Sequence, residues 1–103
     1  MWPHDATKAE RRAARERVST YYEQELAKLL ERVGEAIDKY RAGELDVHDV
    51  DDLIHRYKRA ARRLYSFCWD RGGGSHVVFI AHVLDEPELG SRDWWEEAEP
   101  RRR

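Results

Sequence analysis

Cysteine is nearly absent from this 103-residue chain, which holds Cys68 alone. A single thiol cannot form an internal disulfide, which fits a reducing compartment. The longest purely apolar run, residues 77–81, is far shorter than the roughly 20 residues of a membrane-spanning helix. Residues 1–5 lack the basic stub and apolar run of a signal peptide. We therefore expect a cytoplasmic protein with no membrane partner.

No charge of one sign dominates the chain either, because its formal net charge is −2. Nucleic acid or an anionic membrane would therefore have to bind at a local patch. Charged residues make up 39% of the chain and apolar residues 41%, which is too apolar and too patterned for a disordered protein. The length fits one small domain. Arginine far outnumbers lysine, a bias that indicates a high-GC bacterial genome.

The clearest pattern that is present is an apolar stripe at helical spacing between residues 47 and 68. Every a, d and e position is apolar in a heptad frame that begins at Val50, and most other positions are charged. Asp46 is suited to cap the start of this helix, and the glycines at 72–74 end it. The pattern predicts a helix that is buried against more than one neighbour.

A second stripe of the same width precedes it, from Tyr22 to Tyr40. Gly43 is expected to stop this helix, because glycine adopts the left-handed conformation of a helix C-terminus. Only residues 43–45 separate the two helices, and so short a link makes them antiparallel. We expect Glu23, Glu25, Glu31 and Glu35 to form ion pairs across this hairpin with Arg56, Lys58, Arg59, Arg62 and Arg63.

The remaining segments flank the hairpin, which we place at residues 18–71. Residues 1–17 form a helical extension with a charged face, and residues 72–87 form a glycine linker and a short third helix that Pro87 ends. Residues 88–103 form an acidic tail that contains tryptophan. Residues 77–84 are β-branched enough to suggest a strand, but no second strand is present to pair with them. The predicted fold class is therefore all-α.

Two helices alone cannot bury stripes of this width, so the hairpin needs a further surface. Three solutions are open: a homodimer that forms a four-helix bundle, burial against a different protein, or a monomer closed by the third helix and the tail. The residues expected at the oligomer interface are Leu26, Leu29, Val33, Ile37, Leu53, Ile54, Tyr57, Leu64 and Phe67.

The tail and the basic patches are candidate partner-binding sites. Trp94 and Trp95 either fold back on their own hairpin or anchor the chain in the groove of another protein. Nucleic acid is the alternative partner, and its phosphates would contact Arg11, Arg12, Arg15, Arg59, Arg62 and Arg63. The first patch consists of Lys8, Arg11, Arg12, Arg15 and Arg17, and it could instead be neutralised by acids near the C-terminus. These acids are Asp85, Glu86, Glu88, Asp93, Glu96, Glu97 and Glu99. The expected partner-binding residues are Trp94, Trp95, Arg59, Arg62 and Arg63.

Two other features are candidates for chemical sites. His48, Asp52 and His55 share one helix face, but that face lies opposite the buried stripe, so we expect solvated side chains and no metal or cofactor. Cys68 is expected to be a small buried residue, because no histidine is placed to activate its thiol.

Arg71 and His76 have the spacing Arg-x4-His, which resembles the ribonuclease motif of the HEPN superfamily of small helical RNA-cleaving domains. The resemblance covers six residues and would make Arg71 and His76 catalytic. In that family a polar residue follows the arginine, whereas glycines stand here. The alternative is an arginine at a helix end and a histidine in the next first turn.

The segments at residues 31–37 and 51–57, with the Trp-rich acidic tail, resemble small uncharacterised helical proteins of actinobacteria. That resemblance implies no activity. The sequence therefore favours a non-catalytic helical protein that binds other proteins, with a nucleic-acid-binding regulator and a HEPN-like ribonuclease as alternatives.

Overall fold

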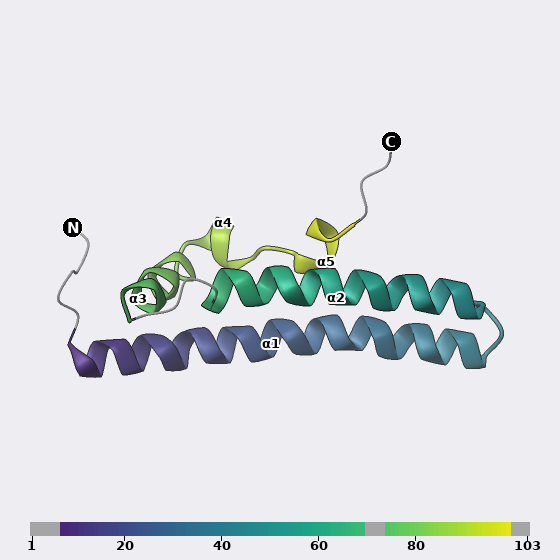
Figure 1. Cartoon of the computed structure of the whole chain (residues 1–103), viewed down its shortest axis with the longest axis horizontal. Helices are drawn as coiled ribbons and strands as arrows, with labels where there is room; N and C mark the ends of the chain where they lie inside the picture. The colour runs from purple at the N-terminus through teal and green to yellow at the C-terminus, as the bar shows by residue number, and fades with distance from the viewer. Residues whose placement is uncertain (1–6, 70–73, 100–103) are drawn as a thin grey trace. The chain divides into compact units, whose positions relative to one another are not determined.

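The computed structural model describes residues 7–69 and 74–99. This part of the chain is helical and contains no strand, which confirms the all-α class. The helices are α1 (Lys8–Arg41), α2 (Val47–Trp69), α3 (Gly74–Val83), α4 (Pro87–Gly90) and α5 (Trp94–Glu97), as Figure 1 shows. The segment at residues 77–84, for which a strand was the alternative, is helical up to Val83.

The described residues divide into two units, each of which takes part of both long helices. The hairpin unit comprises residues 24–64 and 93–99, and therefore holds the α1–α2 hairpin and α5. The terminal unit comprises residues 7–23, 65–69 and 74–92, and holds the start of α1, the end of α2, α3 and α4.

Both long helices begin with a reciprocal cap, which satisfies backbone N–H groups that a helix start leaves unpaired. At α1 the hydroxyl of Thr7 accepts a hydrogen bond from Glu10 N (3.0 Å), and the Glu10 carboxylate accepts one from Thr7 N (2.8 Å). At α2 the Asp46 carboxylate accepts from Asp49 N (2.9 Å), and that of Asp49 accepts from Asp46 N (3.1 Å). The predicted cap at Asp46 is confirmed.

The turn between α1 and α2 depends on Gly43, whose φ of 81° lies in the left-handed region. Glu44 N then donates to Lys39 O (2.8 Å), and Gly43 N donates to Tyr40 O (3.1 Å). These bonds use carbonyls that the end of a helix leaves free. The predicted stop at Gly43 is therefore confirmed.

The core of the hairpin unit consists of small and aliphatic residues from the two long helices together with the short α5. Its buried residues are Leu29, Ala36, Ala60, Leu64, Trp94, Trp95 and Ala98. In Figure 1 the residue 24–41 part of α1 runs antiparallel to the residue 47–64 part of α2, and α5 lies along α2. The single-layer hairpin therefore receives a cover on one side from its own tail.

The terminal unit has a core of its own, built largely from α3. Its buried residues are Ala14, Val18, Tyr21, Cys68, Val77, Val78, Ile80 and Leu84. Aromatic rings extend this core, since Tyr21 lies 6.2 Å from Phe67 and Tyr22 lies 6.3 Å from Trp69 between ring centroids. Cys68 is buried, as expected of a small structural residue.

The start of α1 buries apolar residues, although its a and d heptad positions are charged. Lys8, Arg12 and Arg15 occupy the a and d positions there, but the structure buries Ala14 and Val18. The reason is the helical period, because a straight helix has 3.6 residues per turn whereas a heptad frame assumes 3.5. The buried side therefore moves steadily out of a fixed frame along a helix of 34 residues.

The segment after α3 differs from the expected pattern at Pro87. Helix α3 ends at Val83, before the proline, and Pro87 then opens the short helix α4. Proline is favoured at the first helical position because its fixed φ suits the helix and the missing N–H is not needed there. Ser91 closes this turn by donating its hydroxyl to Pro87 O (2.6 Å).

Candidate interaction surfaces

Helix α5 is held on the hairpin by its two tryptophans. Trp94 is 2% exposed and Trp95 is 5% exposed, so both rings are buried within their own chain. Asp93 fixes the start of α5, because its carboxylate accepts a hydrogen bond from Glu96 N (3.1 Å). Of the two alternatives for these tryptophans, the structure shows the fold-back on the hairpin.

Arg56 joins α2 to α5 through several contacts. Its Nε donates to the backbone oxygen of Trp95 (3.0 Å), and its terminal nitrogen lies 3.2 Å from the Glu96 carboxylate. The guanidinium also stacks over the Trp95 ring, 4.6 Å from the centroid, and that of Arg32 on α1 lies 5.4 Å from it. A cation over an aromatic face is attracted to the ring quadrupole.

Two further arginines continue this row along α2. Arg59 Nε donates to the backbone oxygen of Ala98 (3.1 Å), and Arg63 lies 3.4 Å from the Glu97 carboxylate. Among the described residues no acid of α1 forms an ion pair with α2, so the expected cross-hairpin pairs are wrong. The acids of the tail take that place, because α5 lies closer to the charged side of α2.

A second group of basic residues on α2 shares Arg59 with this row, and its other members form no ion pair or hydrogen bond with the described part of the tail. His55, Lys58, Arg59 and Arg62 line a surface hollow of about 240 Å³. His55 lies 3.4 Å from the carboxylate of Asp51. Within the described part of the chain, Lys58 and Arg62 have no ion pair or hydrogen bond. We call these four residues the basic ridge.

The side of the hairpin that α5 leaves uncovered is apolar. Leu30 is 51% exposed, Val47 59% and Tyr40 48%. Leu30 is two residues from Arg32, and each residue turns a helix by about 100°, so Leu30 points roughly 200° away from the side that α5 covers. The residues of this open face that are partly or largely exposed are Leu26, Leu30, Val33, Ile37 and Tyr40 on α1, and Val47, Val50, Ile54, Tyr57 and Ala61 on α2.

The residues expected at an oligomer interface separate into two groups in the structure. Leu29 and Leu64 are buried inside the chain. The partly exposed members are Leu26, Val33, Ile37, Leu53, Ile54, Tyr57 and Phe67. Leu30 and Val47 were missed as interface candidates, although their places in the apolar stripes of the sequence were an available signal.

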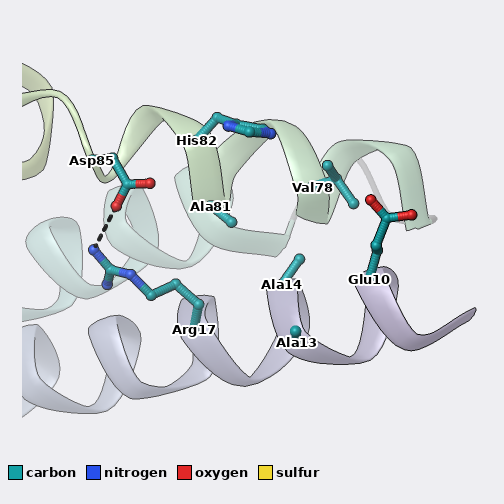
Figure 2. A pocket seen from close by; sticks show the side chains of 8 residues that line it. All are labelled: Glu10, Ala13, Ala14, Arg17, Val78, Ala81, His82 and Asp85. Carbon is teal, nitrogen blue, oxygen red and sulfur yellow. Dashed lines mark ion pairs between the residues drawn. The ribbon is translucent and has the colours of Figure 1, made fainter. Parts of the chain in front are cut away.

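The terminal unit carries a groove between the start of α1 and α3 (Figure 2). Ala13, Ala14, Val78 and Ala81 contribute its apolar part, and Glu10, Arg17, His82 and Asp85 its polar part. Arg17 and Asp85 form an ion pair of 3.5 Å across one end. This pair is an instance of the expected neutralisation of the first basic patch by an acid. Arg12 and Arg15 of that patch are exposed on α1.

The described candidates for chemistry on α2 form no metal site. His48, Asp52 and His55 are exposed on α2, and no cluster of three potential ligands that could hold a metal exists in the described part of the chain. Arg71 lies outside the described residues. His76 is on α3, where its Nε2 is buried without a hydrogen-bond partner among the residues that the structure describes.

Comparison with known proteins gives no match: no family model, no curated protein and no solved structure matches the chain. In residues 7–69 and 74–99, no helix combines the length and the apolarity needed to cross a membrane. The open face and the basic ridge of the hairpin unit are therefore the surfaces that bear on function.

Proposed function

We propose that the chain is a non-catalytic helical interaction protein that pairs with a second copy of itself through the open face of its hairpin. The observation that supports this most strongly is the exposure of Leu30 and Val47, one from each of the two apolar stripes. Contiguous apolar surface of this kind typically marks an interaction site.

A second copy is the partner that this face fits best. An identical hairpin supplies an apolar face of the same width and length, and two such hairpins make a four-helix bundle with two-fold symmetry. The residues of the open face are all uncharged. Its self-association is therefore not opposed by like-charge repulsion, whereas it offers no charge by which to select a different protein.

Gly34 supports the close approach of another helix at this face. Glycine in the interior of a helix is unfavourable by about 0.8–1.0 kcal/mol relative to alanine. Gly34 lies inside α1 between Leu30 and Ile37, its φ is not positive, and a Cβ there would meet no described atom within 4 Å. The packing of this chain gives no reason for the glycine, whereas a partner backbone crossing at Gly34 would.

The test changes Leu30 to glutamate. Complete burial of a leucine contributes about 1.5–3 kcal/mol, and Leu30 is already half-buried in the single chain, so about half of this remains to be gained per copy. A symmetric dimer loses that gain twice, so Leu30→Glu is expected to weaken dimerisation at least about 10-fold, as measured by sedimentation equilibrium. Gln24→Glu is the matched control, because it adds the same charge to an exposed position of α1 about 120° around the helix.

Gly34→Leu tests whether the open face is an interface or is simply exposed to solvent. Gly34 is exposed, a Cβ there meets no described atom, and leucine has better helix propensity, so the fold should keep its melting temperature or gain stability. The dimer should nevertheless dissociate, while Gln24→Leu leaves it intact. Unchanged association of both Leu30→Glu and Gly34→Leu would rule out the open face as the interface.

A further inference from the structure

We infer that the basic ridge of α2 is a binding site for the phosphate backbone of duplex nucleic acid, contacted without regard to base sequence. This inference does not rest on pairing through the open face, because duplex binding and self-association are measured separately. Lys58 borders that face, since it lies two residues, or about 200°, from Arg56 on α2. It starts from two cations, Lys58 and Arg62, that no residue of the described chain neutralises.

The ridge differs from the neighbouring row of arginines in what it faces. Arg56 and Arg63 are paired with Glu96 and Glu97, and are therefore already used in holding α5. Lys58 and Arg62 lie on another side of α2, and no carboxylate is among the described residues that line the hollow. At one end of the ridge, His55 has an acid beside it, Asp51. The ridge is therefore a local cationic surface on a chain of net charge −2.

Arg59 belongs to both rows, and its guanidinium is held in one orientation. Its Nε is bound to the backbone oxygen of Ala98, which orients the guanidinium. Arginine has further N–H donors beyond Nε, and these can contact a phosphate oxygen. A cation that is already oriented loses less conformational entropy when it binds an anion.

The size of the hollow argues against an organic ligand. Its volume of about 240 Å³ is below the roughly 300–1,000 Å³ that is typical of small-molecule sites, and its lining residues are all basic or histidine. A single small anion is also a poor fit, because an exposed ion pair in water contributes only about 0–1 kcal/mol. A polyanion gains more, since each neutralised phosphate releases condensed counterions.

The length of the ridge limits how many phosphates it can reach. Residues 55 to 62 span two turns of α2, which is about 10 Å at 1.5 Å per residue. One strand of a duplex rises about 3.4 Å per nucleotide along the duplex axis while its backbone winds around that axis, so the ridge reaches at most about three phosphates. The ridge supplies three permanent cations, Lys58, Arg59 and Arg62. No tryptophan, tyrosine or phenylalanine is among the described residues that line the hollow, so bases of a single strand would find little ring surface there beyond His55.

The experiment compares the full chain with Lys58→Gln/Arg62→Gln by fluorescence anisotropy on a labelled DNA duplex, from 50 to 200 mM salt. With three phosphate contacts, affinity should fall about 40-fold over this range, and with the one contact left in the double variant about 3.5-fold. At 50 mM salt the double variant should bind at least about fivefold more weakly. Lys28→Gln/Arg41→Gln is the control, because it removes one lysine and one arginine from exposed positions of α1.

Three further readouts decide the proposal. Equal melting temperatures by circular dichroism show that the double variant is folded, as expected for exposed residues with no described partner. Duplexes of unrelated sequence should bind equally. The inference is wrong if the control loses as much affinity as the double variant, or if the unmodified chain does not bind at 50 mM salt. It is also wrong if a single strand or pyrophosphate binds to Lys58 and Arg62 more tightly than the duplex does.

Discussion

At the scale of single residues, short polar contacts define where the helices begin and how the tail is attached. Thr7 and Glu10 cap α1, Asp46 and Asp49 cap α2, and Asp93 caps α5. The pattern Thr-x-x-Glu is a known signature of a helix start, so the cap at Thr7 was available from the sequence. The bond from Arg56 to the Trp95 oxygen was not, because it joins residues 39 positions apart.

Glu10 gives a prediction about pH. The backbone N–H of Thr7, and then its hydroxyl, stabilise the charged carboxylate and lower the pKa of Glu10 below its ordinary value. A lowered pKa in the folded chain means that the cap stabilises α1 above the ordinary pKa of glutamate. That contribution is lost as the pH falls through the lowered value. Amide exchange at the first turn of α1 should therefore accelerate in acid.

Thr7→Ala provides the control for this pH effect. Loss of an N-cap side chain typically costs about 0.5–2 kcal/mol, and the hydroxyl contact to Glu10 disappears with it. The pKa of Glu10, followed by carbon NMR of its carboxyl group, should rise toward the ordinary value. An unchanged pKa in Thr7→Ala would show that the hydroxyl does not contribute.

At the scale of elements, α5 is the part of the fold that the sequence placed least securely. It has only four residues, too few to be stable alone, and it is ordered by what it contacts. Trp94 and Trp95 provide burial, and Arg56, Arg59 and Arg63 bind the backbone and acids of the same segment. Burial of adjacent tryptophans was among the sequence-based alternatives. The docking position was not, because it depends on tertiary contacts.

Trp95→Ala tests whether burial or charge holds α5 in place. Truncation of a buried tryptophan typically costs about 3–5 kcal/mol, which is a large part of the stability of a small domain. Glu96→Gln removes only the ion pair with Arg56. The Glu96 side chain is 62% exposed, so this loss should cost about 0–1 kcal/mol. Urea unfolding followed by circular dichroism measures both. An equal loss of unfolding free energy in the two variants would contradict the view that the tryptophan ring holds α5 on the hairpin.

At the scale of the whole molecule, the all-α class and the hairpin followed from local signals. The a/d/e stripe of α2, the cap at Asp46 and the stop at Gly43 each act within a few residues, so the sequence was enough to predict them. The ion pairs could not be predicted in the same way. Arg56 and Arg63 had acids within plausible reach on α1 and on the tail, and only the packed structure shows that Glu96 and Glu97 bind them.

The candidate surfaces were predictable to a similar degree. The sequence indicated an apolar excess on the hairpin, but Leu29 and Leu64 could not be separated from Leu30 and Val47 without knowing which side α5 covers. The same is true of the basic ridge. Only the position of the tail shows that Arg56 and Arg63 are paired with its acids, whereas Lys58 and Arg62 are not.

The central proposal is that the open face of the hairpin joins two copies of the chain. Sedimentation equilibrium of the unmodified protein over a wide concentration range tests it most directly. A concentration-dependent mass that approaches twice 12.3 kDa is the expected result, because association buries Leu30 and Val47. A mass of one chain at every concentration, including the highest, would contradict the proposal.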